Sequence, residues 1–270
     1  MLRVNIFFIK RIQSGGQHMK INTSEKRDIS LIIIMLAWVA VVIFCVAYTL
    51  NTTASAEIRR LPVYSVDTDV KEIAFTFNCA WGTQGLDEVL NLLTEEDIKS
   101  TFFFVGDFAE NHPDAVRRIY NAGHEIGNHS LKHIDPVTQS YEELLSDISA
   151  CNELLYSVTG AKTVLYRAPS GSYDNKTVEA AESLGMTAVQ WDVDSIDWKD
   201  ISPEKIISRV TAKVTNGSII LYHIGKENTV KALPAIIKAL KREGYSFVTV
   251  GKLLPDGDTY LDHTGRLFTR

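Results

Sequence analysis

Apolar runs rich in β-branched and aromatic residues alternate with segments of helical periodicity, and this alternation constrains the fold more than any other feature. The expected strands are Glu72–Phe77, Ser100–Val105, Glu125–Gly127, Thr163–Arg167, Thr187–Asp192, Gly217–His223 and Ser246–Val250. The expected helices are Gly85–Asp97, Pro113–Ala122, Ser140–Thr159, Asn175–Leu184, Pro203–Thr215 and Thr229–Arg242. Several runs are continuous rather than alternating, which is typical of strands buried on both faces. The pattern predicts an α/β fold with a parallel sheet, either a barrel or an open doubly wound sheet.

The residues at the boundaries of the expected helices agree with the periodicity of the segments. Gly123, Gly185 and Gly244 follow expected helices, where glycine often ends a helix. Ser202 precedes Pro203, a pair that favours the start of a helix.

A block of 22 residues, Ile29–Leu50, carries no charged side chain. As a helix it would span roughly 33 Å, enough for the core of a bilayer. We interpret residues 29–50 as a transmembrane helix. The basic residues just before it place residues 1–28 in the cytoplasm and the rest of the chain outside. A cleaved signal peptide is the alternative, because Ala54-Ser55-Ala56 has the small-x-small pattern, although the apolar run exceeds the ~7–15 residues of a signal core.

The formal net charge of −5 hides an uneven distribution. Residues 1–28 carry +4, the apolar block carries none, and the remainder carries −9. An acidic body without clustered Lys and Arg argues against nucleic-acid binding. No phosphate-binding glycine loop follows the first expected strand, so we expect no nucleotide as a partner.

Around the membrane block and the sheet we expect a linker at residues 51–70, the main domain at 71–254 and a turn-rich, loosely ordered tail at 255–270. Residues 1–18 are hypothesised to be a mis-assigned start, because the segment before Met19 could be encoded by a ribosome-binding sequence.

Three cysteines, Cys45, Cys79 and Cys151, do not predict a disulfide framework, because one of them lies in the apolar block. A disulfide between Cys79 and Cys151 is possible from the sequence, but we expect both cysteines to be free and buried.

Polar side chains follow the ends of the expected strands, where parallel-sheet proteins place their chemistry. They are Asn78, Cys79, His129, His133, Arg167, the segment Asp192–Trp198 and His223. His129 and His133 form an HxxxH pair, which on a helical turn would offer two nitrogens to one metal ion. Each feature alone also has a structural interpretation, such as a surface pair, a turn or a core histidine.

Five segments, taken in order, resemble the motifs of the NodB-homology polysaccharide deacetylases, carbohydrate esterase family 4. They are Thr76-Phe-Asn-Cys-Ala-Trp-Gly82, His129-Ser-Leu-Lys-His133, Arg167-Ala-Pro-Ser-Gly171, Asp194-Ser-Ile-Asp197-Trp198 and Leu221-Tyr-His223. The resemblance runs from about Lys71 to Leu253. The Ala-Trp-Gly variant and the apolar N-terminal block look closest to the sporulation-associated branch.

The resemblance implies a distorted (β/α) barrel of NodB type that removes acetyl groups from N-acetylated sugars by a metal-activated water. It makes His129 and His133 metal ligands and Arg167 the residue that orients the base. It makes His223 the general acid and Asp197 its partner. The implied substrate-binding residues are Trp81, Pro169, Trp198, Leu221 and Tyr222.

The first motif departs from the family pattern. Asn78 stands where the family has its general base, and an amide cannot take a proton from water at neutral pH. Cys79 stands where the family has an aspartate metal ligand. A Cys79–His129–His133 set would be an acceptable zinc triad, and zinc-bound water would need less help from a base. The other hypothesis is that Cys79 is a small apolar filler and that the metal is weak or missing.

Two functions follow from this departure. One is a membrane-anchored deacetylase of cell-wall or spore-cortex glycan that uses a divalent metal, zinc above all. The other is a catalytically impaired homologue that binds carbohydrate or serves as a scaffold through the same cleft. The partners expected in both cases are an N-acetylated glycan, such as peptidoglycan, and the membrane.

Overall fold

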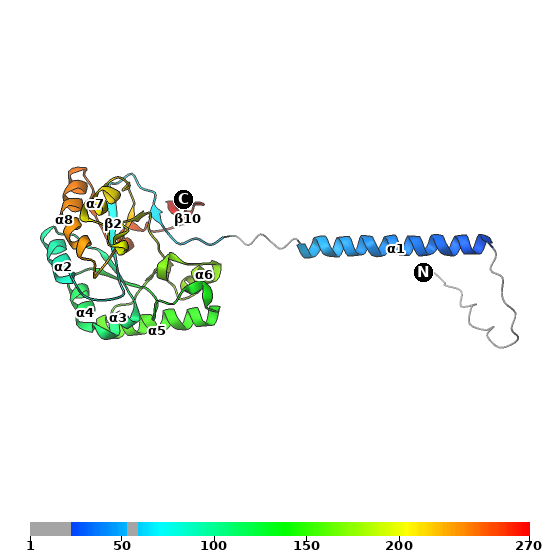
Figure 1. Cartoon of the computed structure of the whole chain (residues 1–270), viewed down its shortest axis with the longest axis horizontal. Helices are drawn as coiled ribbons and strands as arrows, with labels where there is room; N and C mark the ends of the chain where they lie inside the picture. The colour runs from blue at the N-terminus through cyan, green and yellow to red at the C-terminus, as the bar shows by residue number, and fades with distance from the viewer. Residues whose placement is uncertain (1–22, 53–58) are drawn as a thin grey trace. The chain divides into compact units, whose positions relative to one another are not determined.

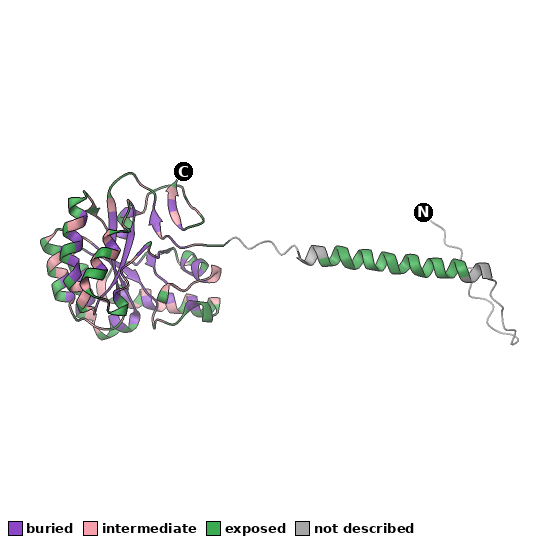
Figure 2. Ribbon diagram, turned by 45° about the horizontal axis from the view of Figure 1, so that its top comes forward, coloured by how far each residue is buried: buried purple, intermediate pink, exposed green. Residues whose placement is uncertain are grey.

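The computed structural model describes residues 23–52 and 59–270, and the chain divides into two compact units, residues 1–58 and 59–270. The hypothesised start at Met19 and the Ala54–Ala56 pattern fall outside the described residues. In the first unit, helix α1 runs from Thr23 to Thr52 and is exposed over residues 27–48 (Figure 2). It is long and apolar enough to cross a membrane, a property that signal sequences share.

The second unit is a curled half-barrel of parallel strands with helices packed outside it (Figure 1). Its strands are β1 (Ser65–Val66), β2 (Glu72–Cys79), β3 (Thr101–Phe104), β4 (Glu125–Asn128), β5 (Leu165–Tyr166), β6 (Thr187–Ala188), β7 (Val193–Asp194), β8 (Ile219–His223), β9 (Ser246–Phe247), β10 (Thr259–Leu261) and β11 (Arg266–Thr269). Its helices are α2 (Leu86–Glu95), α3 (Gly106–Asn111), α4 (Pro113–Asn121), α5 (Tyr141–Thr159), α6 (Asn175–Ser183), α7 (Pro203–Thr211), α8 (Glu227–Arg242) and α9 (Val250–Leu253). Three short 3₁₀ turns are η1 (Pro136–Thr138), η2 (Pro169–Gly171) and η3 (Asp197–Lys199).

The main sheet has the strand order β6-β5-β4-β3-β2-β8-β7, and β9 adds two residue pairs to the start of β2. Of the two architectures that the sequence left open, the barrel describes this curled sheet better than an open doubly wound sheet. The barrel is incomplete, because the two end strands, β6 and β7, do not pair with each other. All these ladders are parallel, so the carboxyl ends of the strands meet at one rim.

Both faces of β2 are buried, which explains its nearly continuous apolar sequence. Ile73, Phe75, Phe77 and Cys79 pack in the main apolar cluster, which includes buried residues of the helices. The alternate residues Thr76 and Asn78 contact Arg167 instead, and therefore lie on the other face of the strand.

Residues 61–66 and 259–269, expected to be linker and loosely ordered tail, are built into the second unit. Strand β1 pairs with β11, and β11 pairs with β10, to form a small separate sheet. The same entry segment reaches the ends of the main sheet. The Val63 amide donates to the Ala188 carbonyl at 2.9 Å, and the Val66 amide donates to the Gly217 carbonyl at 2.9 Å. The periodicity missed these strands because they lie in segments rich in turn-forming residues, where no apolar run marks them.

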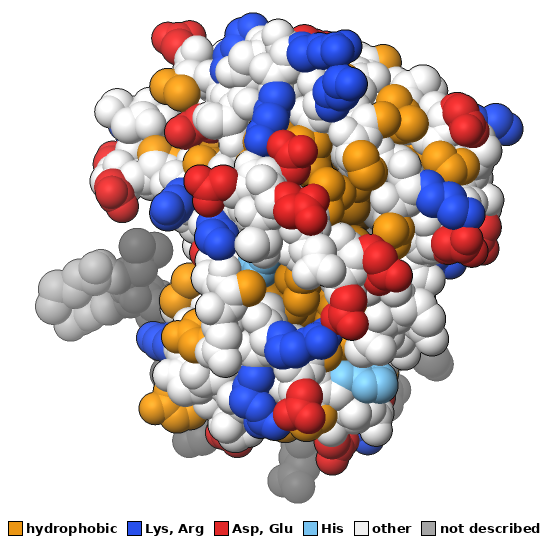
Figure 3. Space-filling model, turned by 90° about the vertical axis from the view of Figure 1, so that its left-hand side faces the viewer, with side chains coloured by type: hydrophobic (Ala, Val, Ile, Leu, Met, Phe, Trp, Pro, Cys, Tyr) orange, Lys and Arg blue, Asp and Glu red, His pale blue; other side chains and the backbone are white. Residues whose placement is uncertain are grey.

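Lys and Arg side chains are not clustered on the face shown in Figure 3, as the sequence indicated. They are interspersed there with Asp and Glu, and no basic stripe crosses this face. A phosphate backbone would need such a stripe.

Candidate active site

The rim at the carboxyl ends of the strands collects the polar residues singled out in the sequence. Asn78 is the last but one residue of β2, and its register partner on the neighbouring strand is His223, the last residue of β8. His129 follows β4, and Arg167 follows β5. The parallel register therefore brings four sequence-distant residues to one place.

Asn78 is the centre of a buried hydrogen-bond network and is 4% exposed. Its amide nitrogen lies 3.1 Å from His129 Nε2, and its amide oxygen accepts from Arg167 Nη1 at 3.1 Å. His129 Nδ1 lies 2.8 Å from the Arg167 carbonyl oxygen. Burial holds the pKa of His129 well below its ordinary value, so the imidazole is neutral at pH 7.

Arg167 is fully buried beneath the rim, and no carboxylate pairs with it in the described structure. Its guanidinium donates to Thr76 Oγ1 at 2.8 Å and to the Gln190 carbonyl at 3.0 Å, and it lies 4.0 Å from the centre of the Phe103 ring. Burial lowers the pKa of Arg167 to about 9, so the cation persists at neutral pH. Asn78 supplies a dipole where a carboxylate would have supplied a counter-charge.

Asp197 and His223 form the second polar pair of the rim. Asp197 is fully buried, and its Oδ1 lies 2.7 Å from His223 Nδ1. Its Oδ2 accepts from the His223 amide at 2.8 Å and from the Thr229 hydroxyl at 2.7 Å. Because a carboxylate only accepts, Nδ1 of His223 donates this hydrogen bond, and Nε2 is the other ring nitrogen.

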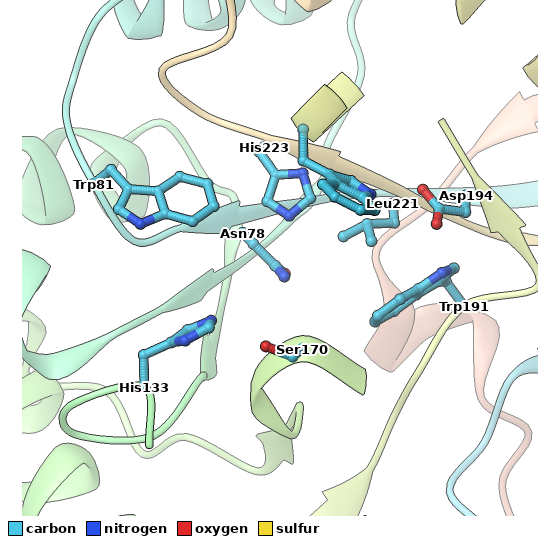
Figure 4. Close-up of a pocket in the computed structure, with 9 residues that line it drawn as sticks. Asn78, Trp81, His133, Ser170, Trp191, Asp194, Leu221 and His223 are labelled. Carbon is cyan, nitrogen blue, oxygen red and sulfur yellow. The ribbon is translucent and has the colours of Figure 1, made fainter. Parts of the chain in front are cut away.

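A cavity of about 330 Å³ opens above these groups (Figure 4). It is lined by Asn78, Trp81, His133, Ser170, Trp191, Asp194, Trp198, Leu221 and His223. The Trp81 ring stacks on His223 with 5.7 Å between ring centres. Three tryptophans thus meet two histidines in one cleft, an arrangement of apolar walls with a few polar groups that suits a small ligand.

Three of the five expected substrate-binding residues line the cavity. Trp81, Trp198 and Leu221 line it. Tyr222 does not, because it points to the opposite face of β8, is fully buried and stacks on Phe77. Pro169 is buried below the rim, and its neighbour Ser170 lines the cavity instead.

Five residues at the site had no role in the sequence-based prediction, although Thr76, Ser170 and Asp194 lie within its motif segments. Ser170, Trp191 and Asp194 line the cavity, and the place of Trp191 directly before the Asp192–Trp198 segment was a usable signal. Thr76 was also detectable, because two residues before Asn78 on a strand means the same face. Thr229 contacts Asp197 from α8, and no local pattern pointed to it.

The HxxxH segment is a loop rather than the expected helical turn. Ser130 and His133 both have left-handed backbones, with φ of 72° and 56°. The loop still brings the two imidazoles together, with ring centres 5.1 Å apart. His133 is partly exposed and lines the cavity, whereas His129 is 1% exposed.

Cys79 does not join the two histidines. It is fully buried in the apolar cluster on the other face of β2, and burial raises the pKa of its thiol well above the ordinary value. Among the described residues, no group of three His, Cys, Asp or Glu side chains is placed to hold a metal ion. The predicted Cys79–His129–His133 triad is therefore wrong, because strand alternation sends Cys79 away from the rim. The residues present do not fit a catalytic zinc centre, which needs three protein ligands.

Comparison with known proteins supports the resemblance. A family model described as "Polysaccharide deacetylase" matches residues 65–189. A peptidoglycan-N-acetylglucosamine deacetylase of Bacillus cereus is 32% identical over 196 residues, which cover 71% of this chain and 92% of that protein. The chain belongs to the polysaccharide deacetylase family. This is carbohydrate esterase family 4, whose members are hydrolases of carbon–nitrogen bonds and which also contains pseudoenzymes.

Two further relatives bear on this family member. The uncharacterized protein YlxY of Bacillus subtilis is 33% identical over 195 residues, covering 72% of this chain and 61% of YlxY. The solved structure of BA3943 from Bacillus anthracis, described as a pseudoenzyme of carbohydrate esterase family 4, has a TM-score of 0.70 and 32% identity, with 72% and 68% of the two chains covered. A BA3943 mutant with restored enzymatic activity gives the same TM-score and identity, with 72% and 71% covered.

Proposed function

We propose that α1 anchors this family member in the membrane, with residues 1–28 in the cytoplasm, and that the body binds an N-acetylated glycan of the cell wall or spore cortex outside it. The observation that carries the binding proposal is the convergence of Trp81, Trp191 and Trp198 on one cleft. Indole rings offer flat apolar faces, which suit the carbon–hydrogen faces of pyranose rings. The peptidoglycan deacetylases among the relatives support the choice of glycan.

The polar groups of the cleft fit such a ligand. His133, Ser170 and Asp194 face the cavity and can bond to hydroxyl and amide groups of a sugar. A cavity of about 330 Å³ lies at the small end of ligand sites, so we expect it to take one or two sugar rings.

We propose that hydrolysis by the family's metal-activated water is lost in this chain. Asn78 cannot act as the base, and the strand turns Cys79 into the apolar core. The pseudoenzyme BA3943 supports this proposal, because it shows that the fold tolerates loss of the reaction.

A second candidate is slow deacetylation, and the Asp197–His223 pair favours it. The carboxylate holds His223 in the tautomer whose Nε2 could carry a proton to or from a ligand in the cleft. Thr229 and the His223 amide keep this carboxylate in place.

One set of measurements separates the two candidates. The full chain in detergent is tested for binding to N-acetylglucosamine oligomers and to peptidoglycan, and acetate release is measured in the same samples with added zinc. We expect binding without acetate release. Trp198→Ala should weaken binding roughly fivefold, because it removes one stacking wall that is worth about 1 kcal/mol.

The exposed Tyr156, which lies on α5 and does not line the cleft, provides the matched control as Tyr156→Ala. Acetate release that disappears in His223→Ala would establish the second candidate. Equal binding by the parent and Trp198→Ala would remove the cleft from the glycan proposal.

A further inference from the structure

We propose that Asn78 takes the place of the metal, because its amide hydrogen occupies the one lone pair of His129 that a cation would use. An internal hydrogen bond then closes the site to divalent metal ions. The loss of one metal ligand is therefore not the only reason that the site does not bind a metal. This inference does not depend on glycan binding.

The protons in the network are fixed from both ends. The Arg167 guanidinium only donates, so the Asn78 atom it contacts is the amide oxygen, and the amide nitrogen faces His129. The Arg167 carbonyl only accepts, so His129 Nδ1 carries the proton and Nε2 carries the lone pair. The Asn78 nitrogen therefore donates to that lone pair at 3.1 Å.

A metal ion cannot share this lone pair. Histidine binds a metal through an unprotonated ring nitrogen, and in His129 that nitrogen is Nε2 because the backbone holds Nδ1. To free it, Asn78 would have to rotate away from both His129 and Arg167, two side chains that are almost fully buried. The rotation would leave a buried guanidinium hydrogen without its partner.

Arg167 is the part of the network that keeps the amide in place. Its Nη1 also donates to Thr76, whose hydroxyl donates in turn to the Ile220 carbonyl at 2.7 Å. Thr76 and Asn78 lie on one face of β2, so the strand sets the distance between them. The amide is thus held by a rigid element on one side and a buried cation on the other.

His133 cannot hold a metal ion alone. It approaches from the loop after β4 and lines the cavity with its own ring. One available imidazole falls short of the three protein ligands that a zinc site with an open position uses.

The test compares zinc binding by the full chain in detergent and by two variants, using equilibrium dialysis against zinc chloride. Asn78→Ala removes the amide and adds no ligand. We expect it to bind zinc roughly 10- to 100-fold more tightly than the parent, the range over which partners of a ligating histidine change metal affinity. Asn78→Asp adds a carboxylate beside the histidines, and should bind more tightly still.

The outcomes are distinct. Zinc affinity in the order parent, Asn78→Ala, Asn78→Asp supports the inference, and His129→Ala in the Asn78→Asp background should abolish the gain. If Asn78→Asp binds zinc but Asn78→Ala matches the parent, the parent merely lacks a ligand and the inference is wrong. Tight binding by the parent also overturns it. Asn152→Asp, which makes the same charge change on α5 away from the cavity, is the control and should match the parent.

A second measurement needs no variant. Ring nitrogen chemical shifts of His129 in the parent should report a proton on Nδ1 and an Nε2 that excess zinc leaves unchanged. A zinc-dependent shift of Nε2 would contradict the inference. Glycan binding is measured in a separate experiment, so a failure of the proposed function would not change the conclusion about zinc binding.

Discussion

At the scale of single residues, one amide changes the chemistry of the site. Asn78 neither accepts a proton nor carries a charge, yet it satisfies His129 and Arg167 at once. The sequence identified Asn78 as the point of departure from the family pattern. It could not show the amide on His129, because that contact joins residues 51 positions apart.

Replacing Asn78 with Leu should lower the free energy of unfolding by about 2–4 kcal/mol. The change keeps the number and branching of the side-chain heavy atoms but leaves one buried hydrogen of Arg167 and one lone pair of His129 without partners. Urea denaturation of the two proteins measures the difference. Asn91→Leu on the exposed face of α2 is the matched control and should stay within about 0.5 kcal/mol of the parent. A similarly small change at Asn78 would mean that the network contributes little.

Asp192 should make stability depend on pH. Burial raises the pKa of its carboxyl from 3.8 to about 6, although Ser218 and the Ile219 amide both donate to it. Between pH 4 and 6 the folded state therefore holds a proton that the unfolded chain has lost, so this group makes stability fall as pH rises.

Asp192→Asn can keep both hydrogen bonds and loses the titration. Because Asp192 is more than a third exposed to solvent, which screens the effect, the parent should lose only about 1 kcal/mol of unfolding free energy relative to this variant between pH 4 and 7. Urea denaturation at pH 4, 5, 6 and 7 measures the gap. The exposed Asp114→Asn is the control. A gap that stays constant with pH would contradict the assignment.

At the scale of elements, periodicity located the long helices and most strands of the main sheet, but it missed the three strands of the small sheet. Strands β2 and β8 are continuous apolar runs, and their side chains are buried. Strands β10 and β11 pair with each other as neighbours in the sequence, whereas β1 pairs with β11, which lies far along the chain. The long-range pairing of β1 carries no local signal.

Gly217 tests how closely the entry segment is built into the body. Its φ is +77°, and an added Cβ would lie 1.9 Å from the Val66 carbonyl oxygen. Gly185 has a similar φ of +70° with nothing within 4 Å of such a Cβ. Gly185→Ala should therefore cost about 1 kcal/mol for backbone strain alone.

Gly217→Ala carries the same strain and must also displace β1. We expect it to cost about 3 kcal/mol or more, measured by thermal or urea unfolding beside the Gly185 variant. Equal losses in the two variants would show that residues 61–66 can leave the barrel without cost.

At the scale of the whole molecule, an apolar helix precedes a body with the fold of a cell-wall enzyme family. If α1 is a retained anchor, the intact chain should stay in the membrane fraction after washing with high salt or at alkaline pH, because burial of 22 apolar residues resists both. Mass spectrometry of the native protein then finds residues 29–50 still attached. A soluble form beginning near residue 57 would identify a cleaved signal peptide instead.

The sequence by itself determined the alternation of strands and helices, the apolar N-terminal helix and the family, because these depend on local periodicity and on motifs in a fixed order. It also brought Asn78, His129, Arg167, Asp197 and His223 to one rim, since parallel strands end at the same edge. Only the tertiary structure decided which face of β2 each side chain occupies. That choice puts Cys79 in the core and Asn78 on His129. Alternation along the strand separates the two residues onto opposite faces, but the sequence does not say which face turns toward the histidines.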